Sequence, residues 1–269
     1  MKFDAYGATI RDHEFKYVAH CLSDSVNGFL SKGKPMKRYV ETINIDSENR
    51  TAAWVGYEQH SGMIYVEAKG ETTPMLVKAI RSNFPVHSAS RLDVAEDYDG
   101  PDAFNALQSV IRAHKGSRTK GGYVALPDDV EDGKTWAAGT RGGVGYIRLY
   151  EAGKHPDRVH LGRPDWVRAE VEIRPHYGRD KRAAATMSEL DVWGMTAWTH
   201  KVGEALSHVE INRFEPEIRR YSHDKTTRYI ANTFRRHFEE MLSNGEHLEA
   251  TIRDVWREED EFNKIIRRR

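Results

Sequence analysis

Acidic and basic side chains alternate with apolar ones in the segment 91–97, which reads Arg-Leu-Asp-Val-Ala-Glu-Asp. Side chains two positions apart in a β-strand share a face, so Arg91, Asp93 and Asp97 are expected to point the same way. Leu92 and Val94 would then face the core. Carboxylate oxygens are the ligands that Mg²⁺ and Mn²⁺ prefer. The segment therefore predicts either part of a divalent-metal site or an edge strand whose outer face is solvated and salt-bridged.

A second alternating segment covers residues 167–173. Arg168, Glu170 and Glu172 would share one face, and the apolar residues between them the other, as in a half-buried antiparallel strand. If this strand lies beside 91–97, several carboxylates could converge on one ion, because carboxylates that close repel each other unless a cation sits among them. The candidate metal ligands are Asp93, Asp97, Glu170 and Glu172. The other interpretation is an exposed strand with alternating charges.

Tyrosine and arginine alternate in a third segment, where Tyr146, Arg148 and Tyr150 would share a face. A tyrosine near cations and a metal can act as a nucleophile, because positive charge favours the phenolate. Arg141, Arg148 and Lys154 could supply that charge and bind phosphates. Tyr146 is an alternative nucleophile, since both tyrosines lie on the same face. The other interpretation is a strand with amphipathic tyrosines at its rim.

Composition limits the class of protein. The chain has 269 residues, of which 39% are hydrophobic and 30% charged, and its formal net charge is zero. The single cysteine, Cys21, excludes an internal disulfide and a multi-cysteine zinc site. The sequence has no apolar run long enough for a membrane span and no apolar signal core, so we expect a cytoplasmic protein without a membrane partner. Zero net charge does not exclude DNA binding, because a local basic face can bind DNA.

The elements that would position these residues follow from hydrophobic periodicity. A helix is expected from residue 15 to residue 30, where apolar residues recur every four positions, and others over 74–84, 103–115 and 181–209. Strands are expected over 5–10, 38–45, 51–57, 62–68, 88–97, 123–126, 135–138, 144–150 and 166–174. This order predicts an α+β fold: an antiparallel sheet from two similar βββα-like halves, about 1–100 and 101–212, with helices on one face.

Residues 213–269 are expected to form a helical C-terminal extension to the catalytic region 1–212. Two amphipathic helices, over about 230–242 and 248–266, are separated by Asn244-Gly245. They would form a hairpin packed on the core, or an element for dimerisation or partner docking.

Taken together, the motifs resemble those of one family. Arg91/Asp93/Asp97, then Gly133-Lys134-Thr135 with Gly139, then Arg148-Leu149-Tyr150, then Arg168/Glu170 occur in the order found in the replication initiation factors of filamentous phages and rolling-circle plasmids (the Rep_trans type). The resemblance covers roughly residues 50 to 210. It implies an enzyme that recognises a replication origin, cuts one DNA strand with a tyrosine, stays linked to the 5′ phosphate and later rejoins the ends.

The resemblance also implies roles for single residues. Tyr150 matches the family's nucleophile, and Asp93 and Glu170 match its acidic site for Mg²⁺ or Mn²⁺. The family's lysine after the tyrosine is displaced here to Lys154, and there is no His-hydrophobe-His pair, so carboxylates must hold the metal, with His87 as a candidate further ligand. The expected DNA contacts are Arg91, Lys134, Arg141 and Arg168. The implied partners are origin DNA, the single strand at the nick, host helicase and polymerase, and a second copy of the chain, in the host cytoplasm if a phage encodes it.

Two other functions use the same residues. A metal-dependent nuclease that activates water would need Asp93, Glu170 and Glu172 but not Tyr150, and a non-catalytic DNA-binding regulator would need none of the acids. A phosphotyrosine ester conserves the energy of the broken bond, so a tyrosine beside an acidic cluster favours nicking and joining. Basic residues cluster in two places, which are interpreted either as DNA contacts or as solvated loops. They are Arg112, Lys115, Arg118 and Lys120, and Arg179, Lys181 and Arg182.

Overall fold

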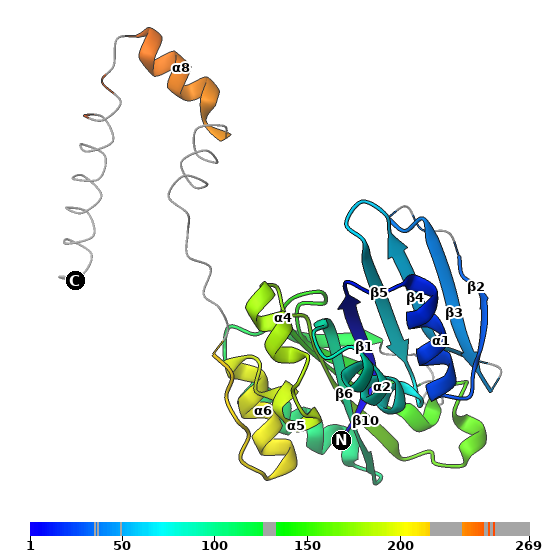
Figure 1. The fold of residues 1–269 in the computed structure, drawn as a ribbon. Helices are drawn as coiled ribbons and strands as arrows, with labels where there is room; N and C mark the ends of the chain where they lie inside the picture. The colour runs from blue at the N-terminus through cyan, green and yellow to red at the C-terminus, as the bar shows by residue number, and fades with distance from the viewer. Residues whose placement is uncertain are drawn as a thin grey trace, which may run out of the picture. The chain divides into compact units, whose positions relative to one another are not determined.

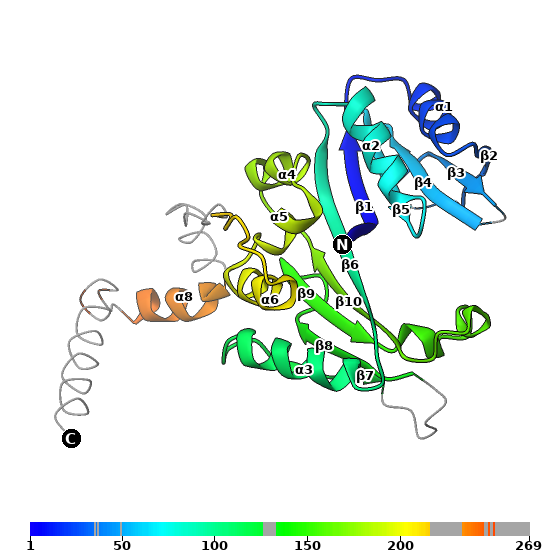
Figure 2. The same ribbon diagram turned by 90° about the horizontal axis from the view of Figure 1, so that it is seen from below.

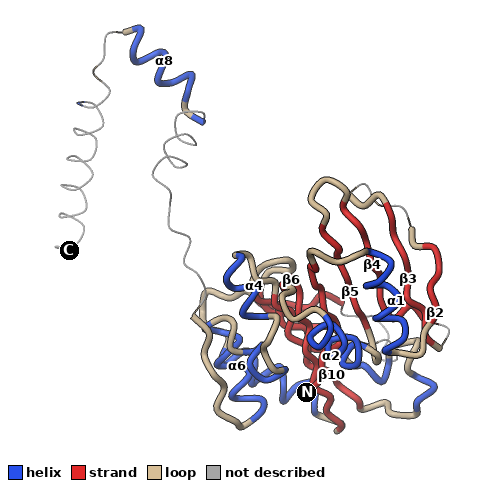
Figure 3. Tube along the Cα trace, in the orientation of Figure 1, coloured by secondary structure: helices blue, strands red, loops and turns tan. Residues whose placement is uncertain are grey.

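The computed structural model describes residues 1–34, 36, 38–48, 50–125, 133–215, 233–244, 247 and 250. The chain divides into two compact units, Met1–Glu217 and Ile218–Arg269. In the first unit, runs of consecutive strands are separated by helices (Figure 1, Figure 3). No helix among the described residues is long and apolar enough to cross a membrane.

The first unit is built on one antiparallel sheet with the order β2-β3-β4-β5-β1-β6-β10-β9-β8-β7. Its strands are β1 (Lys2–Ile10), β2 (Phe29–Lys32), β3 (Glu41–Ser47), β4 (Arg50–Glu58), β5 (Met63–Lys69), β6 (Ser88–Asp99), β7 (Gly121–Ala125), β8 (Thr135–Gly139), β9 (Gly145–Tyr150) and β10 (Trp166–Ile173). The predicted α+β class with an antiparallel sheet is confirmed.

The two halves of the sheet repeat one topology. In the first, β1 is followed by a helix and then by four strands, and the spatial order from the centre outwards is β1-β5-β4-β3-β2. In the second, β6 is followed by a helix and four strands, with the order β6-β10-β9-β8-β7. The halves join where β1 pairs with β6. The second repeat therefore begins at β6.

Helices cover one face of this sheet, as predicted. Helices α1 (Phe15–Ser25) and α2 (Thr73–Asn83) lie against the first half (Figure 1). Helices α3 (Ala103–His114), α4 (Gly178–Ala184), α5 (Glu189–Trp193) and α6 (Ala197–Ser207) lie against the second (Figure 2). The apolar positions of the alternating strands, among them Leu92, Val94 and Val171, are fully buried beneath the helices in one core. The polar positions of the same strands face the other way, on what we call the open face.

Two predicted helices were wrong in extent. The helix from residue 15 ends at Ser25, because Asn27 adopts a left-handed φ of 48°, and Leu30 instead lies on β2 opposite Ile45. The helix predicted over 181–209 is three short ones, because new N-caps form at Ser188 and at Thr196, whose side chains accept hydrogen bonds from the backbone of Asp191 and Thr199. Apolar spacing continues across these breaks and conceals them.

Two further differences concern the second half and the second unit. Gly121 and Gly122, which precede the strand predicted over 123–126, both lie in β7 and pair with β8. In the second unit, helix α8 (Arg235–Ser243) overlaps the first predicted C-terminal helix, over about 230–242. The second predicted helix, over 248–266, falls outside the described residues except for position 250.

Candidate active site

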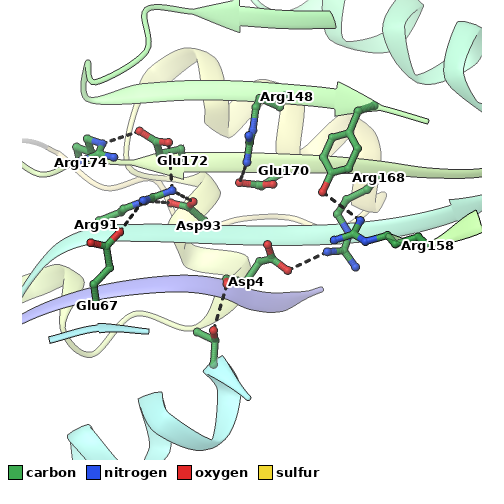
Figure 4. Close-up of polar contacts among 12 residues, drawn as sticks. Asp4, Glu67, Arg91, Asp93, Arg148, Arg158, Arg168, Glu170, Glu172 and Arg174 are labelled. Atoms are coloured by element: carbon green, nitrogen blue, oxygen red, sulfur yellow. Dashed lines mark hydrogen bonds and ion pairs between the residues drawn. The ribbon is translucent and has the colours of Figure 1, made fainter. Parts of the chain in front are cut away.

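The two strands with alternating acids lie side by side at the centre of the sheet. β10 pairs with β6 so that Arg168 is opposite Asp97 and Glu172 is opposite Asp93. On its other edge β10 pairs with β9, which places Tyr150 opposite Arg168. Because these residues all point to the open face, the structure brings the three sequence motifs together (Figure 4).

The acids are more deeply buried than the sequence predicted. β10 was expected to be half-buried, but every residue in it is buried, on both faces. Asp93 and Glu170 are each only 1% exposed. A buried charge is costly unless it is paired and hydrogen-bonded. The arginines on the same strands supply that pairing, which explains why acids and arginines alternate together in this sequence.

Each carboxylate has an arginine partner (Figure 4). Arg91 Nε donates to Asp93 Oδ1 at 2.9 Å, and Arg148 Nη2 donates to Glu170 Oε1 at 2.6 Å. The other pairs are Arg91 Nη1 with Glu67 Oε1 at 2.9 Å, Arg174 Nε with Glu172 Oε1 at 2.5 Å, and Arg168 with Asp97 Oδ1 at 2.7 Å and Asp4 Oδ1 at 2.8 Å. Arg91 and Arg168, expected to contact DNA, are thus engaged by carboxylates within the protein.

Asp93 and Glu170 are the acids best suited to a divalent cation. Glu170 Oε2 is buried and has no hydrogen-bond partner among the residues that the structure describes. Burial, together with the charges of Glu170 and Glu172, raises the pKa of Asp93 to about 7 despite its bonds to Arg91. A cation between the two carboxylates would offset both penalties. Mg²⁺ is commonly held by one or two carboxylates, with water and substrate phosphate completing its shell, so these two residues fit it.

The other candidate ligands are differently placed. Asp97 Oδ1 accepts from Arg168 and from Trp166 Nε1, and its Oδ2 accepts from Arg168, so both oxygens are engaged. His87 lies beneath the opposite face, where its ring bonds Tyr6 and the Phe84 carbonyl. Among the described residues there is no group of three or more His, Cys, Asp or Glu arranged to hold a metal. A cation here would therefore depend on two carboxylates and on oxygens from outside the protein.

Tyr150 borders a small pocket on the open face. The pocket has a volume of about 260 Å³ and is lined by Tyr150, Thr135, Arg148, His155 and Arg158. Arg158 Nη1 lies 3.5 Å from the phenolic oxygen of Tyr150. Burial and the charge of Glu170 raise the pKa of Tyr150, while Arg168 and Arg158 act to lower it. The pocket thus offers a phenol flanked by guanidinium groups, which is suited to receiving a phosphate.

Tyr146, the alternative nucleophile, lies further along β9 opposite Glu172 and is only 6% exposed. It does not line the pocket that Tyr150 borders. Accessibility therefore favours Tyr150 as the residue that could reach a phosphodiester.

The remaining predicted basic residues lie outside this cluster. Lys154 Nζ bonds Glu151 at 3.1 Å, just beyond the end of β9. Lys134 Nζ lies 5.9 Å from the ring centroid of Phe104, a core residue of α3, so it is turned towards the helices. Arg141 is exposed in the turn between β8 and β9. Of these three, the structure leaves Arg141 the most accessible to DNA.

Sequence reasoning missed several residues of the site. Arg158 and His155 lie in the connection between β9 and β10, and Asp4 and Glu67 reach the site from β1 and β5. No spacing in the sequence marks them, because loop residues follow no period and the strand order is needed to place β1 and β5. Only the alternation Tyr65-Val66-Glu67 indicated that Glu67 would face away from the core.

Comparison with solved structures gives a fold relationship. The fold is similar to that of the rolling circle replication initiator protein from Geobacillus stearothermophilus, with a TM-score of 0.50 and 17% sequence identity over 71% of this chain and 81% of that one. No family model and no curated protein sequence matches the chain.

Proposed function

We propose that the protein is a rolling-circle replication initiator, a DNA nicking and joining enzyme that uses Tyr150 as its nucleophile. One observation carries the proposal: the Tyr150 phenol lies at a pocket between Arg148 and Arg158, in the same face as the buried carboxylates Glu170 and Asp93. The similarity in fold to a rolling circle replication initiator protein supports it, as does the order of the motifs in the sequence.

In the first step, the oxygen of Tyr150 attacks the phosphorus of one phosphodiester in the pocket. The new bond joins Tyr150 to the 5′ phosphate and the bond from phosphorus to the 3′ oxygen breaks. The phenolic proton leaves to solvent, and the 3′ oxygen takes up a proton from solvent to become a 3′ hydroxyl. Arg148 and Arg158 hold the phosphate in line for this attack and offset its developing charge, which is most of what phosphoryl transfer requires.

Asp93 and Glu170 would hold one Mg²⁺ or Mn²⁺. When bound, such a cation polarises the phosphate and stabilises the leaving 3′ oxygen. Arg91 and Arg148 keep the two carboxylates in place through their hydrogen bonds. Because burial holds the pKa of Tyr150 above its ordinary value, we expect the free protein to keep the phenol protonated.

Joining is the reverse reaction. A 3′ hydroxyl attacks the phosphotyrosine, restores the phosphodiester and releases Tyr150. The ester conserves the bond energy, so joining needs no nucleotide cofactor. The partners we propose are origin DNA and the single strand at the nick, with host helicase and polymerase acting on the freed 3′ end, and a second copy of the chain.

The experiment is a nicking assay. The full chain is incubated with Mg²⁺ or Mn²⁺ and supercoiled DNA carrying the origin of its own replicon, and the products are separated on a denaturing gel with and without protease. We expect a nicked circle with protein attached to the 5′ end, lost in Tyr150→Phe and kept in Tyr146→Phe, the matched control from the same strand face.

Two results would contradict the proposal. A nick with a free 5′ phosphate that survives Tyr150→Phe would indicate a nuclease that uses water. Origin binding without cleavage in any metal, unchanged when Asp93 and Glu170 are replaced by their amides, would indicate a regulator.

A further inference from the structure

A large groove lies on the open face of the first half, away from Tyr150. Its volume is about 1150 Å³, and its floor is formed by side chains of β3, β4 and β5, in the half that is blue and cyan in Figure 1. One edge is formed by the segment that contains Arg38 and Tyr39, and α4 contributes Lys181 and Arg182. The proposed chemistry at Tyr150 uses none of these residues.

Three aromatic rings gather in this groove. Tyr39 meets Trp54 edge-to-face with ring centroids 4.9 Å apart and stacks on Tyr65 at 6.1 Å, and Trp54 and Tyr65 are 5.8 Å apart. All three are partly exposed, so ring surface remains accessible. Aromatic side chains on an open sheet face are a stacking surface for unpaired bases of any sequence.

Two glycines keep space for these rings. A Cβ atom at Gly56 would lie 2.7 Å from the Trp54 ring and 2.9 Å from that of Tyr39. A Cβ atom at Gly7 would lie 2.8 Å from the hydroxyl of Tyr65. Real Cβ atoms essentially never come so close, so any other residue at either position would displace a ring. The arrangement of the rings therefore depends on strand positions without side chains.

Positive charge dominates the lining of the groove. Six basic side chains line it, against the two acids Glu58 and Glu67; the six are Arg11, Lys34, Arg38, Lys69, Lys181 and Arg182. Both acids are paired, Glu58 with Arg38 at 2.7 Å and Glu67 with Arg91 and Lys69 at 2.9 Å. In the part of the chain that the structure describes, no ion pair engages the other four basic residues. The chain is neutral overall, so this local excess marks a surface for a polyanion.

A chain of ion pairs links the lining of the groove to the candidate active site. Glu67, which lines the groove, bonds Arg91, and Arg91 bonds Asp93. Five strand spacings separate β4 from β9, which is roughly 24 Å along the sheet at the usual distance between strands. A single strand several nucleotides long could span that distance on one face of one sheet.

We propose that this groove binds single-stranded DNA, with unpaired bases stacked on Trp54, Tyr39 and Tyr65 and phosphates held by the basic residues around them. The inference rests on the proposed function, since it assigns to the groove the strand whose phosphodiester Tyr150 attacks. Rings and cations together recognise an unpaired strand, because the bases of a duplex are stacked on one another and cannot lie on the rings.

Binding is measured by fluorescence polarisation with a labelled oligothymidine of about 16 nucleotides and a duplex of equal length. The full chain carries Tyr150→Phe, which prevents covalent attachment. We expect Trp54→Ala and Tyr39→Ala each to weaken oligothymidine binding roughly tenfold. Tyr17→Ala, which removes an exposed tyrosine of α1 that lies outside the groove, should leave it unchanged.

The basic residues provide a second measurement that does not depend on altering half-buried rings. In Lys34→Ala and in Arg182→Ala, the slope of the logarithm of affinity against the logarithm of salt should become shallower by about 0.7, the value for one phosphate on a single strand. Equal affinity of the wild type and all four groove variants, or tighter binding of the duplex, would overturn the inference. If the groove variants bind as tightly as the wild type and the protein still nicks DNA, only the inference about the groove is overturned. If the groove variants bind more weakly but the wild type does not nick DNA, the proposed function is overturned.

Discussion

The two halves of the sheet share a topology but carry different chemistry on the open face. The strand two places from the centre is β4 in the first half and β9 in the second. β4 presents Trp54 to the open face, whereas β9 presents Arg148 and Tyr150. The strand one place from the centre is β5 in the first half and β10 in the second. β5 presents Tyr65 and Glu67 to the open face, whereas β10 presents three charged residues.

Burial differs in the same way. In the second half the acids are buried and each is held by an arginine, whereas in the first half the rings are partly exposed around a groove. A buried polar network orders its members tightly, as phosphoryl transfer requires. An open aromatic surface tolerates many bases and orders them loosely. In the two proposals above, catalysis is assigned to the second half of the sheet and strand binding to the first.

The largest predicted effects come from replacing acids on the open face of each half by their amides. Glu170→Gln in β10 and Asp93→Asn in β6 should each reduce nicking by about 100-fold or more, because one carboxylate cannot hold and orient the cation. Chelation of divalent ions should abolish nicking in the wild type. Initial nicking rates across a Mg²⁺ titration measure both effects, and a higher metal requirement in the variants would identify the carboxylates as ligands.

Glu67→Gln provides the control from the first half, since β5, which carries Glu67, has the place in that half that β10 has in the second. It pairs with Arg91 but is 23% exposed in its side chain and does not contact the Tyr150 pocket. We expect a much smaller loss of rate and an unchanged metal requirement. Equal losses in Glu67→Gln and Glu170→Gln would mean that the chemistry is not confined to the second half.

A second prediction compares arginines. The guanidinium of Arg168 joins Asp97 to Asp4, and the residue is only 3% exposed. Arg168→Met should lower the free energy of unfolding by about 3 kcal/mol, because it leaves two carboxylates without their partner in a partly buried place. Urea unfolding followed by tryptophan fluorescence measures the change.

Arg38→Met is the control in the first half. Arg38 pairs with Glu58 but its side chain is 64% exposed, and exposed ion pairs contribute little to stability. We expect no measurable loss of stability, although binding of a single strand should weaken. A loss as large as that of Arg168→Met would contradict the contrast between a buried network and an open groove.

The contrast between the halves was only partly predictable from the sequence. Period-two alternation assigned Asp93, Glu170 and Tyr150 to the polar side of their strands, because the pleat places alternate side chains on opposite faces. Alternation does not indicate which strands pair with one another, so the ion-pair partners of Asp97 and Glu67 could be identified only once the strand order was known. Whether these acids bind a metal stays a prediction.

The groove was not predicted, for a related reason. Trp54 and Tyr65 lie on different strands and Tyr39 in a loop, so no local pattern joins them. Helix ends were also missed where apolar spacing ran on across a cap, as at Asn27 and Ser188. The signals at those places are local, a left-handed residue and an N-cap serine, and in a sequence they are weaker than hydrophobic periodicity.

The smallest predicted effect tests whether the two halves share one core at their junction. His87 lies between α2 and β6, where its Nδ1 donates to the Phe84 carbonyl and its Nε2 accepts from Tyr6, a residue of β1. The Tyr6 hydroxyl also lies 3.3 Å from the carbonyl of Ala185, which follows α4 of the second half. Burial, with the nearby charge of Arg81, lowers the pKa of His87 below 6.5.

The sign of the pH effect follows from this lowered pKa. At about pH 7.5 and above, the imidazole is almost entirely neutral in both states and contributes little pH dependence. As the pH falls below that value, the unfolded chain binds a proton that the folded chain does not, so the free energy of unfolding decreases until the pH passes the folded pKa. His87→Gln keeps a polar side chain but cannot titrate, so its loss of stability between about pH 7.5 and about pH 5 should be smaller than that of the wild type.

Urea unfolding at the two pH values measures the difference in the free energy of unfolding. Because Asp93 acts in the opposite sense, only the difference between variant and wild type is diagnostic. Equal losses would mean that His87 takes up a proton in the folded protein as easily as in the unfolded chain, and that the junction between the halves is open to water.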